Sequence, residues 1–256
     1  MCEKNYQDIN AETIDRWIEE GWEWGIPIDH QTYADALAGK WDVLLTPTKP
    51  VPRQWFGELA GKKLLGLASG GGQQMPVFAA AGADCTVLDY SVKQLESERM
   101  VAEREGYSIK IVRADMTKPL PFPDESFDMI FHPVSNCYIR EVDPVWRECY
   151  RVLKPGGILL AGLDMGWNFA IDEERDCRLC PLPFDPLSNP EQRKQLEEAG
   201  DGMQFSHTVT EQIGGQLKAG FILTDLYEDT NGIGKLHEYG IPAFTATRSV
   251  KLGQNI

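Results

Sequence analysis

The sequence is short of positive charge. Its 256 residues include 25 Lys and Arg against 39 Asp and Glu, which gives a formal net charge of −14. Proteins that grip a phosphate backbone need a surface rich in Lys and Arg, because neutralising phosphates supplies most of the non-specific affinity. The charge balance therefore argues against nucleic acid as a main partner.

Regularly spaced cysteine pairs and long apolar runs are also missing. The six cysteines, at positions 2, 85, 137, 149, 177 and 180, lack the close, even spacing of a disulfide scaffold. The first twenty residues are too polar and acidic for a signal peptide, and no run approaches the roughly 18 apolar residues of a membrane span. We therefore expect a cytoplasmic protein with reduced thiols and no membrane partner.

Cys177 and Cys180 alone have the spacing of a zinc knuckle. Zinc normally takes four ligands, usually from two such pairs, and the sequence has no second pair. We therefore expect no metal site and interpret both residues as ordinary loop cysteines.

The first 60 residues are rich in tryptophan. We expect Asn10 to cap a helix that ends near residue 20, and Asp29 to cap a second helix that ends near residue 38. A proline-rich connector at 46–52 can continue neither helix. We predict an N-terminal helical cap over residues 1–55, whose tryptophans either form a small core or pack over a ligand. Five of the seven tryptophans lie in this region: Trp17, Trp22, Trp24, Trp41 and Trp55.

From residue 56 to residue 256 the sequence alternates between short apolar runs and helical stretches. This alternation indicates a doubly wound, mainly parallel α/β sheet with right-handed crossovers. Residues 165–207, rich in Pro, Asp, Cys and aromatics, interrupt the alternation and are predicted to be an insertion, either a functional lid or disordered. The expected strands are 63–68, 85–89, 109–112, 127–131, 158–163, 221–227 and 244–250, and the expected helices are 73–81, 91–105, 143–153, 190–198 and 209–219.

A glycine-rich turn at 68–72 separates the first of these strands from its helix. Glycines let the chain turn sharply and let a ligand approach the backbone. Asp89 ends the next strand, where a carboxylate can accept both ribose hydroxyls, and Asp115 follows the third strand. These residues predict a ligand at the carboxyl edge of the sheet.

The order of the motifs resembles that of class I S-adenosylmethionine-dependent methyltransferases. The motifs are Leu64–Gly72, Val87–Ser91, Ala114–Met116, Phe127-Asp128 and Arg151–Gly157. The loop Ser69–Gln74, Ser-Gly-Gly-Gly-Gln-Gln, is similar to that of a bacterial subgroup of type 11-like methyltransferases. The resemblance covers about residues 62–164 and implies a Rossmann-like seven-stranded sheet whose last strand is antiparallel. It also implies S-adenosylmethionine as the cofactor.

The resemblance assigns binding roles as well. It implies that the loop backbone holds the methionine part of the cofactor, Asp89 the ribose, and Asp115 with Met116 the adenine. The adjacent Tyr90 is also expected at the cofactor. The loop that begins at His132 would lie near the departing methyl group. The loop residues expected at the cofactor are Ala68, Ser69, Gly70 and Gly72.

The chain departs from the family pattern at two positions, and it offers no clear catalytic residue. The family usually has an acidic residue where Gly66 stands and a glycine where Ala68 stands. His132 is a candidate general base, with a structural role as the alternative. His207 and His237 are further candidates for the acceptor site.

We therefore expect in-line methyl transfer from S-adenosylmethionine, acting on a small-molecule acceptor. Because the leaving group is a neutral thioether, alignment matters more than acid catalysis. Two alternatives stay open. One is a catalytically inactive S-adenosylmethionine-binding module, and the other is a nicotinamide-dependent oxidoreductase, although Gly70–Gly72 do not begin a G-x-G-x-x-G pattern. The acceptor and the oligomeric state do not follow from the sequence.

Overall fold

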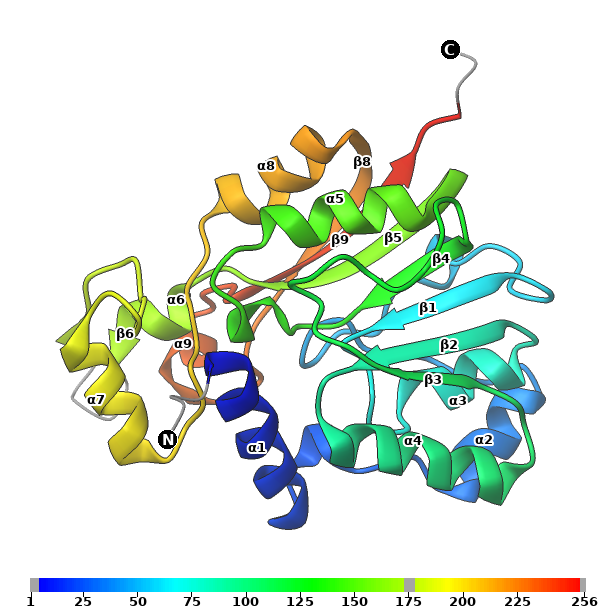
Figure 1. The fold of residues 1–256 in the computed structure, drawn as a ribbon, viewed down its shortest axis with the longest axis horizontal. Helices are drawn as coiled ribbons and strands as arrows, with labels where there is room; N and C mark the ends of the chain where they lie inside the picture. Colours follow the sequence, from blue (N-terminus) through cyan, green and yellow to red (C-terminus); the bar gives the residue numbers. More distant parts are fainter. Residues whose placement is uncertain (1–4, 173–177, 254–256) are drawn as a thin grey trace.

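The computed structural model describes residues 5–172 and 178–253. A seven-stranded sheet forms its centre, with the strand order β3-β2-β1-β4-β5-β9-β8 (Figure 1). β9 is antiparallel to both of its neighbours, and the other strands from β3 to β5 are parallel. The predicted fold is therefore confirmed. The strands are β1 Lys63–Leu67, β2 Asp84–Asp89, β3 Lys110–Arg113, β4 Phe127–His132, β5 Leu153–Asp164, β8 Phe221–Asp229 and β9 Phe244–Lys251.

Helices cover both faces of this sheet. On one face lie α5 (Asp143–Val152) and α8 (Val209–Ala219), and on the other lie α2 (His30–Leu37), α3 (Gln74–Ala80) and α4 (Val92–Glu105) (Figure 1). In the described part of the chain, no helix combines the length and apolar character that crossing a bilayer requires.

A third group of elements gathers at the end of the sheet toward which β1, β2 and β4 point (Figure 1). It contains α1 (Tyr6–Glu19), α6 (Trp167–Ala170), α7 (Pro190–Ala199), α9 (Gly234–Glu238) and the two-stranded sheet of β6 (Ile171–Asp172) and β7 (Arg178–Leu179). The carboxyl ends of the parallel strands thus lie beneath segments that come from the N-terminal region and the insertion.

Alternate residues of β1 pack into two separate cores. Leu65 packs in the core that contains Trp146 of α5, whereas Leu64 packs in the core that contains Phe78 of α3 and Trp55. These side chains are fully buried or nearly so. Because both faces of β1 are covered, the strand appears in the sequence as an uninterrupted apolar run.

The N-terminal helix begins earlier than we expected from the sequence. Asn5, not Asn10, caps α1, and its side chain accepts a hydrogen bond from the Asp8 N–H at 2.8 Å. Asn10 lies inside the helix and is only 5% exposed. Its amide bonds to the Tyr138 carbonyl and to both backbone groups of Met203. A buried asparagine with distant backbone partners cannot be told from a cap by sequence position alone.

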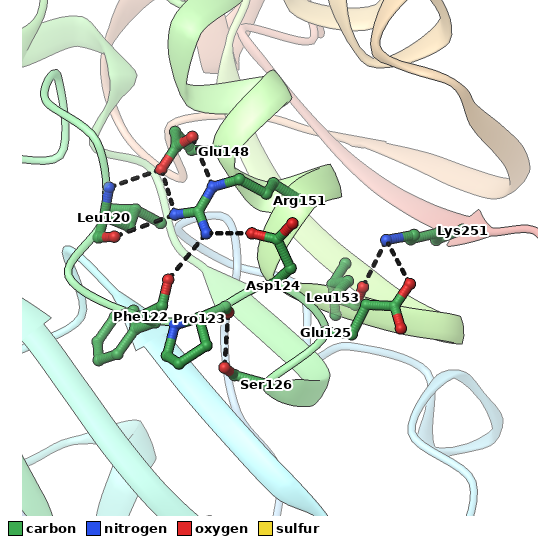
Figure 2. A network of polar contacts seen from close by, with 10 residues as sticks. All are labelled: Leu120, Phe122, Pro123, Asp124, Glu125, Ser126, Glu148, Arg151, Leu153 and Lys251. Carbon is green, nitrogen blue, oxygen red and sulfur yellow. Dashed lines mark hydrogen bonds and ion pairs between the residues drawn. The ribbon is translucent and has the colours of Figure 1, made fainter.

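The segment between β3 and β4 is held by Arg151, which belongs to the Arg-Val-Leu-Lys-Pro-Gly-Gly motif. Its guanidinium donates to the carbonyl oxygens of Leu120 and Phe122 and pairs with Glu148 and Asp124 (Figure 2). A planar guanidinium with five donors suits this set of acceptors better than an ammonium would. The motif therefore has a structural role on the side of the sheet that carries α5.

Asp128, which interrupts the apolar run of β4, has a structural role too. Its carboxylate accepts hydrogen bonds from the Lys63 N–H at 2.9 Å and the Lys154 ammonium at 2.8 Å. Although burial alone would raise it, the pKa of Asp128 is lowered by these two donors. The side chain links the starts of β1 and β5, away from the end of the sheet where α1 lies.

Candidate functional site

A cavity of about 710 Å³ opens at the carboxyl ends of the parallel strands. Its walls come from the loops after β1 to β5, from α1 and the tryptophans that follow it, from residues 44–47, from the insertion and from residues 231–244. The strand order reverses between β1 and β4 at this edge, which is where open α/β sheets bind ligands. The volume is typical of a site for a small molecule or cofactor.

The loop after β1 forms one wall of the cavity. Ala68 adopts a left-handed conformation with φ of 48°, and its N–H donates to the Leu88 carbonyl at 2.8 Å. The Gly70 N–H donates to the Asp89 carboxylate at 3.0 Å. Ala68, Ser69 and Gly70 all line the cavity, as we expected.

Gly70 is required for packing rather than for a positive φ. A β-carbon there would lie 2.6 Å from the Gln94 Cβ and 3.1 Å from the Asp89 carboxylate. Gly72 does have a positive φ, of 67°, but its N–H donates to Glu98. Gly72 is not among the residues that line the cavity, so the structure does not place it where the resemblance implied.

Asp89 ends β2 in the cavity wall. Its carboxylate accepts backbone N–H groups of Gly70 and Ser91, each at 3.0 Å. Burial raises the pKa of Asp89, whereas the N–H groups of Gly70, Ser91 and Tyr90 act in the opposite direction. Since a carboxylate offers about four lone-pair positions, the hydrogen bonds from Gly70 and Ser91 leave about two for ligand hydroxyls. Two is the number that the ribose hydroxyls expected from the sequence would require.

The other residues assigned to the nucleoside also lie at the cavity. Tyr90, Asp115 and Met116 all line it. The Tyr90 hydroxyl donates to the Asp8 carboxylate of α1 at 2.8 Å, and Asp115 accepts the Thr117 N–H at 2.8 Å. Tyr90 therefore connects the strand-end residues to the N-terminal helix.

His132 does not reach the cavity. It is fully buried, and its ring nitrogens lie 2.9 Å from the Leu67 carbonyl and 2.8 Å from the Asn136 amide oxygen. Burial lowers the pKa of His132. Both nitrogens are engaged by protein groups, so the structure favours the structural alternative over the general base.

The other two candidate histidines are also absent from the cavity wall. His207 is buried, with Nε2 2.9 Å from the carbonyls of Asn136 and Ile139. His237 contacts the Thr230 hydroxyl at 2.8 Å. Neither contributes to the candidate acceptor site.

The tryptophans of the N-terminal region divide between the two predicted roles. Trp22 and Trp24 line the cavity, whereas Trp41 and Trp55 pack in the core that contains Phe78 of α3. Trp17 lies 5.3 Å from Trp22 between ring centroids. The sequence could not separate these roles, because all five residues are apolar and lie outside a regular pattern.

Gly66 stands where the family usually has an acidic residue. A β-carbon at this position would lie 2.6 Å from the Met75 sulfur, so Met75 of α3 fills the space that an acidic side chain would need. An acidic side chain at position 66 would therefore require Met75 to move.

Sequence reasoning missed several polar groups of the cavity wall, among them Asp164, Asn168 and Asn231. Asp164 ends β5 and accepts from the Gly166 N–H at 2.7 Å and the Asn168 amide at 2.8 Å. Asn168 in turn accepts from the Asn231 amide at 2.8 Å. A carboxylate at a strand end, the signal that identified Asp89, could have found Asp164. Nothing in the sequence marks Asn231.

No metal centre is evident in the described ranges, where no group of three or more His, Cys, Asp or Glu side chains is arranged to hold an ion. Cys180 lines the cavity, whereas Cys177 lies outside the described residues. Cys137 also lines the cavity, and burial raises the pKa of its thiol. This favours the neutral thiol rather than a reactive thiolate.

Comparisons with known proteins agree on one family. Residues 65–161 match the methyltransferase domain family. The chain is 45% identical over 250 residues to "Uncharacterized methyltransferase YbaJ" of Bacillus subtilis, which covers 95% of this chain and 97% of the relative.

Two solved structures show the same fold at low sequence identity. An S-adenosylmethionine-dependent methyltransferase from Mesorhizobium loti aligns with a TM-score of 0.60 and 20% identity over 77% of this chain and 94% of its own. The [4+2]-cyclase SpnF aligns with a TM-score of 0.61 and 17% identity over 98% of both chains. The second alignment shows that this fold also serves chemistry other than methyl transfer.

Proposed function

The chain belongs to the family of S-adenosylmethionine-dependent methyltransferases, and we propose that it transfers the methyl group of this cofactor to a small molecule. The observation that carries the proposal is the cavity, in which Asp89 keeps acceptor capacity beside the glycine-rich loop. A small-molecule acceptor is favoured because α1 and the insertion surround the same cavity.

The residues of the cavity wall fit the chemistry of S-adenosylmethionine. The backbone of 68–70 would hold the methionine part, Asp89 a ribose hydroxyl, and Asp115 with Met116 the adenine. Gln94 supports this fit, because it lines the cavity, is 9% exposed, and has a buried side-chain oxygen without a protein donor in the described residues. Such an orphan acceptor suits a ligand donor. When bound, S-adenosylmethionine supplies a methyl group on a positively charged sulfur.

The chain's own contribution is alignment and the exclusion of water. Holding the reacting atoms about 3 Å apart can supply several kcal/mol, and a dry site strengthens each polar contact in it. We propose that residues 1–55 act as a cap over the cofactor and that residues 165–207 complete the pocket on the acceptor side. Both segments contribute residues to the cavity wall, including Trp24 and Phe169.

A binding module without catalytic activity would have the same fold and the same cofactor site, so experiment has to separate the two. A nicotinamide-dependent oxidoreductase has no support from the comparisons. Calorimetry with S-adenosylmethionine and with NAD tests the cofactor assignment, and we expect binding of the first alone. Transfer of label from methyl-labelled cofactor to small molecules of a cell extract then tests catalysis. Binding without transfer would favour the module.

Asp89→Ala tests the binding mode. Loss of one charge-assisted hydrogen bond, worth about 1.5–3 kcal/mol, should weaken S-adenosylmethionine binding about ten- to a hundredfold. Asp84→Ala is the matched control, because Asp84 is the exposed residue at the opposite end of β2. If the dissociation constant of Asp89→Ala equals that of the control, the ribose binds elsewhere.

A further inference from the structure

The cavity has two halves with different neighbours. The residues that fit the cofactor follow β1, β2 and β3, which lie on one side of the switch point. The remaining wall follows β4 and β5 and includes residues of the insertion and of the 231–244 segment. With the cofactor over the first three strands, this second half faces the methyl acceptor.

The charge of the cavity wall has one sign. Four aspartates line it, namely Asp89, Asp115, Asp164 and Asp201, and the described residues of the wall include no Lys, Arg or His. Asp164 and Asp201 lie in the acceptor half. A wall of this kind repels anions and attracts cations and hydrogen-bond donors.

The acceptor half also carries a chain of hydrogen bonds that ends in an unpaired acceptor. Asn231 donates to Asn168, and Asn168 donates to Asp164. The side-chain oxygen of Asn231 is buried and lacks a protein donor in the described residues. Burial raises the pKa of Asp164, while Asn168 and the Gly166 N–H act in the opposite direction. The side-chain oxygen of Asn231 and the buried carboxylate of Asp164 are therefore both stabilised by a hydrogen-bond donor on a ligand.

The acceptor half also has a large apolar surface. Phe169, Phe184 and Phe244 line it together with Ile171 and Leu236, and the rings of Phe169 and Phe184 lie 5.2 Å apart between centroids. Apolar walls with a few convergent polar groups are typical of sites that bind an organic molecule by its body and orient it by its polar end.

We propose that the methyl acceptor is an amine with an apolar body, and that Asp164, Asn168 and Asn231 bind its nitrogen. This inference rests on the proposed function. The nitrogen lone pair forms the new bond to the methyl carbon, the bond from carbon to sulfur breaks with its electron pair on sulfur, and one proton leaves the nitrogen for solvent. A carboxylate or phosphate acceptor would meet like charges in this half of the cavity.

Matched sets of compounds test the acceptor class. One set is 2-phenylethylamine, 2-phenylethanol and 3-phenylpropanoate, and a second is hexylamine, hexanol and hexanoate. Binding to protein loaded with S-adenosylhomocysteine is measured by calorimetry, and methyl transfer is measured with labelled S-adenosylmethionine. We expect the amines to bind at least tenfold more tightly than the matched acids and to be the compounds that gain the label.

Variants then connect the preference to the proposed residues. Asp164→Asn should weaken amine binding at least tenfold while S-adenosylmethionine binding stays within twofold. Asn231→Ala, at a less buried position, gives a second test if Asp164→Asn does not fold. Asp124→Asn is the control, because it removes the same charge from a side chain that is 74% exposed and pairs with Arg151 (Figure 2).

The outcomes separate the two proposals. Tighter binding or methylation of the acids or alcohols overturns the amine assignment, as does an absence of amine binding or transfer in protein that binds S-adenosylmethionine. Amine binding that Asp164→Asn and Asn231→Ala leave unchanged overturns the role of these residues. Failure of S-adenosylmethionine itself to bind overturns the proposed function instead.

Discussion

Replacing Glu98 with glutamine should remove a pH dependence from the stability of the protein. Glu98 lies on α4 beneath the glycine-rich loop and is fully buried. Its carboxyl group accepts the Gly72 N–H at 3.0 Å and the Tyr107 hydroxyl at 3.2 Å. Burial raises the pKa of Glu98 from the usual 4.5 to about 7, although both hydrogen bonds act in the opposite direction.

The sign and size of the effect follow from this pKa. Below pH 4.5 the carboxyl is protonated in both the folded and the unfolded chain, and the stability associated with the raised pKa is fully present. Between pH 4.5 and 7 the unfolded chain ionises first, so stability falls as pH rises. The difference between the usual pKa of 4.5 and the folded-state pKa of about 7 corresponds to about 3 kcal/mol in the free energy of unfolding. Glutamine does not titrate, so its effect on stability is constant across this range.

Urea denaturation at pH 5, 6, 7 and 8 measures the effect. The free energy of unfolding of Glu98→Gln, relative to the unmodified protein, should rise by about 2 to 3 kcal/mol from pH 5 to pH 8. Other buried carboxyls, such as Asp89 and Asp164, titrate in both proteins and cancel in the comparison. Glu96→Gln, on the same helix at 52% exposure, is the control. Parallel stability curves for Glu98→Gln and the unmodified protein would refute the reasoning.

Two further predictions concern the glycine-rich loop. Ala68→Gly should leave the free energy of unfolding unchanged or raise it by up to about 1 kcal/mol. Glycine relieves the strain of the left-handed conformation at φ 48°, and this gain offsets the added freedom of the unfolded chain. A clear loss of stability in urea denaturation would contradict this. Gly70→Val should abolish S-adenosylmethionine binding in calorimetry, because its β-carbon would lie 2.6 Å from the Gln94 Cβ and would push the loop from Asp89. Tight binding by a folded Gly70→Val protein would mean that this loop does not hold the cofactor.

Local patterns predicted the sheet well, because each element carries its own signal. The run at β1 is apolar on both faces, α4 is capped by Ser91, and it ends at Gly106 in the left-handed conformation. Asp89 could be predicted to lie at the candidate site, because the carboxyl end of a parallel strand lies at the ligand-binding edge of the sheet whatever the neighbouring residues are. These inferences needed only neighbouring residues and the rules for parallel sheets.

Tertiary contacts account for what the sequence did not predict. Asn10 looked like a cap because its partners Tyr138 and Met203 lie more than a hundred residues away along the chain. His132 occupies a position expected to face the methyl group, yet its ring turns inward to Leu67 and Asn136. In both cases residue type and order were right for the expected role. The side chains, however, point in directions that do not allow these roles, and no local sequence pattern predicts such a direction.

The connector at 46–52 belongs to the proposed cap, and its contacts indicate which part of residues 1–55 can move. Thr48 and Lys49 donate backbone N–H groups to the Asp229 carboxylate at the end of β8. A β-carbon on Gly162 would lie 1.9 Å from the Leu45 carbonyl, so the residue that precedes the connector packs directly against β5. Nearer the N-terminus, Tyr33 of α2 stacks on Tyr107, with 5.6 Å between the ring centroids. These contacts fix residues 30–52 to the sheet domain.

We therefore predict that movement is confined to α1 and the residues up to Trp24. Polar side-chain contacts hold α1 at the cavity, from Asp8 to Tyr90, from Asp15 to Ser91, and from Asn10 to the insertion. Such contacts can exchange for water at modest cost when the helix opens. Hydrogen exchange should show added protection on S-adenosylmethionine binding in residues 6–24 and no change in residues 30–40. Equal exchange of residues 6–24 in both states would make α1 a fixed wall of the site, and added protection across 30–40 would return the hinge to the connector.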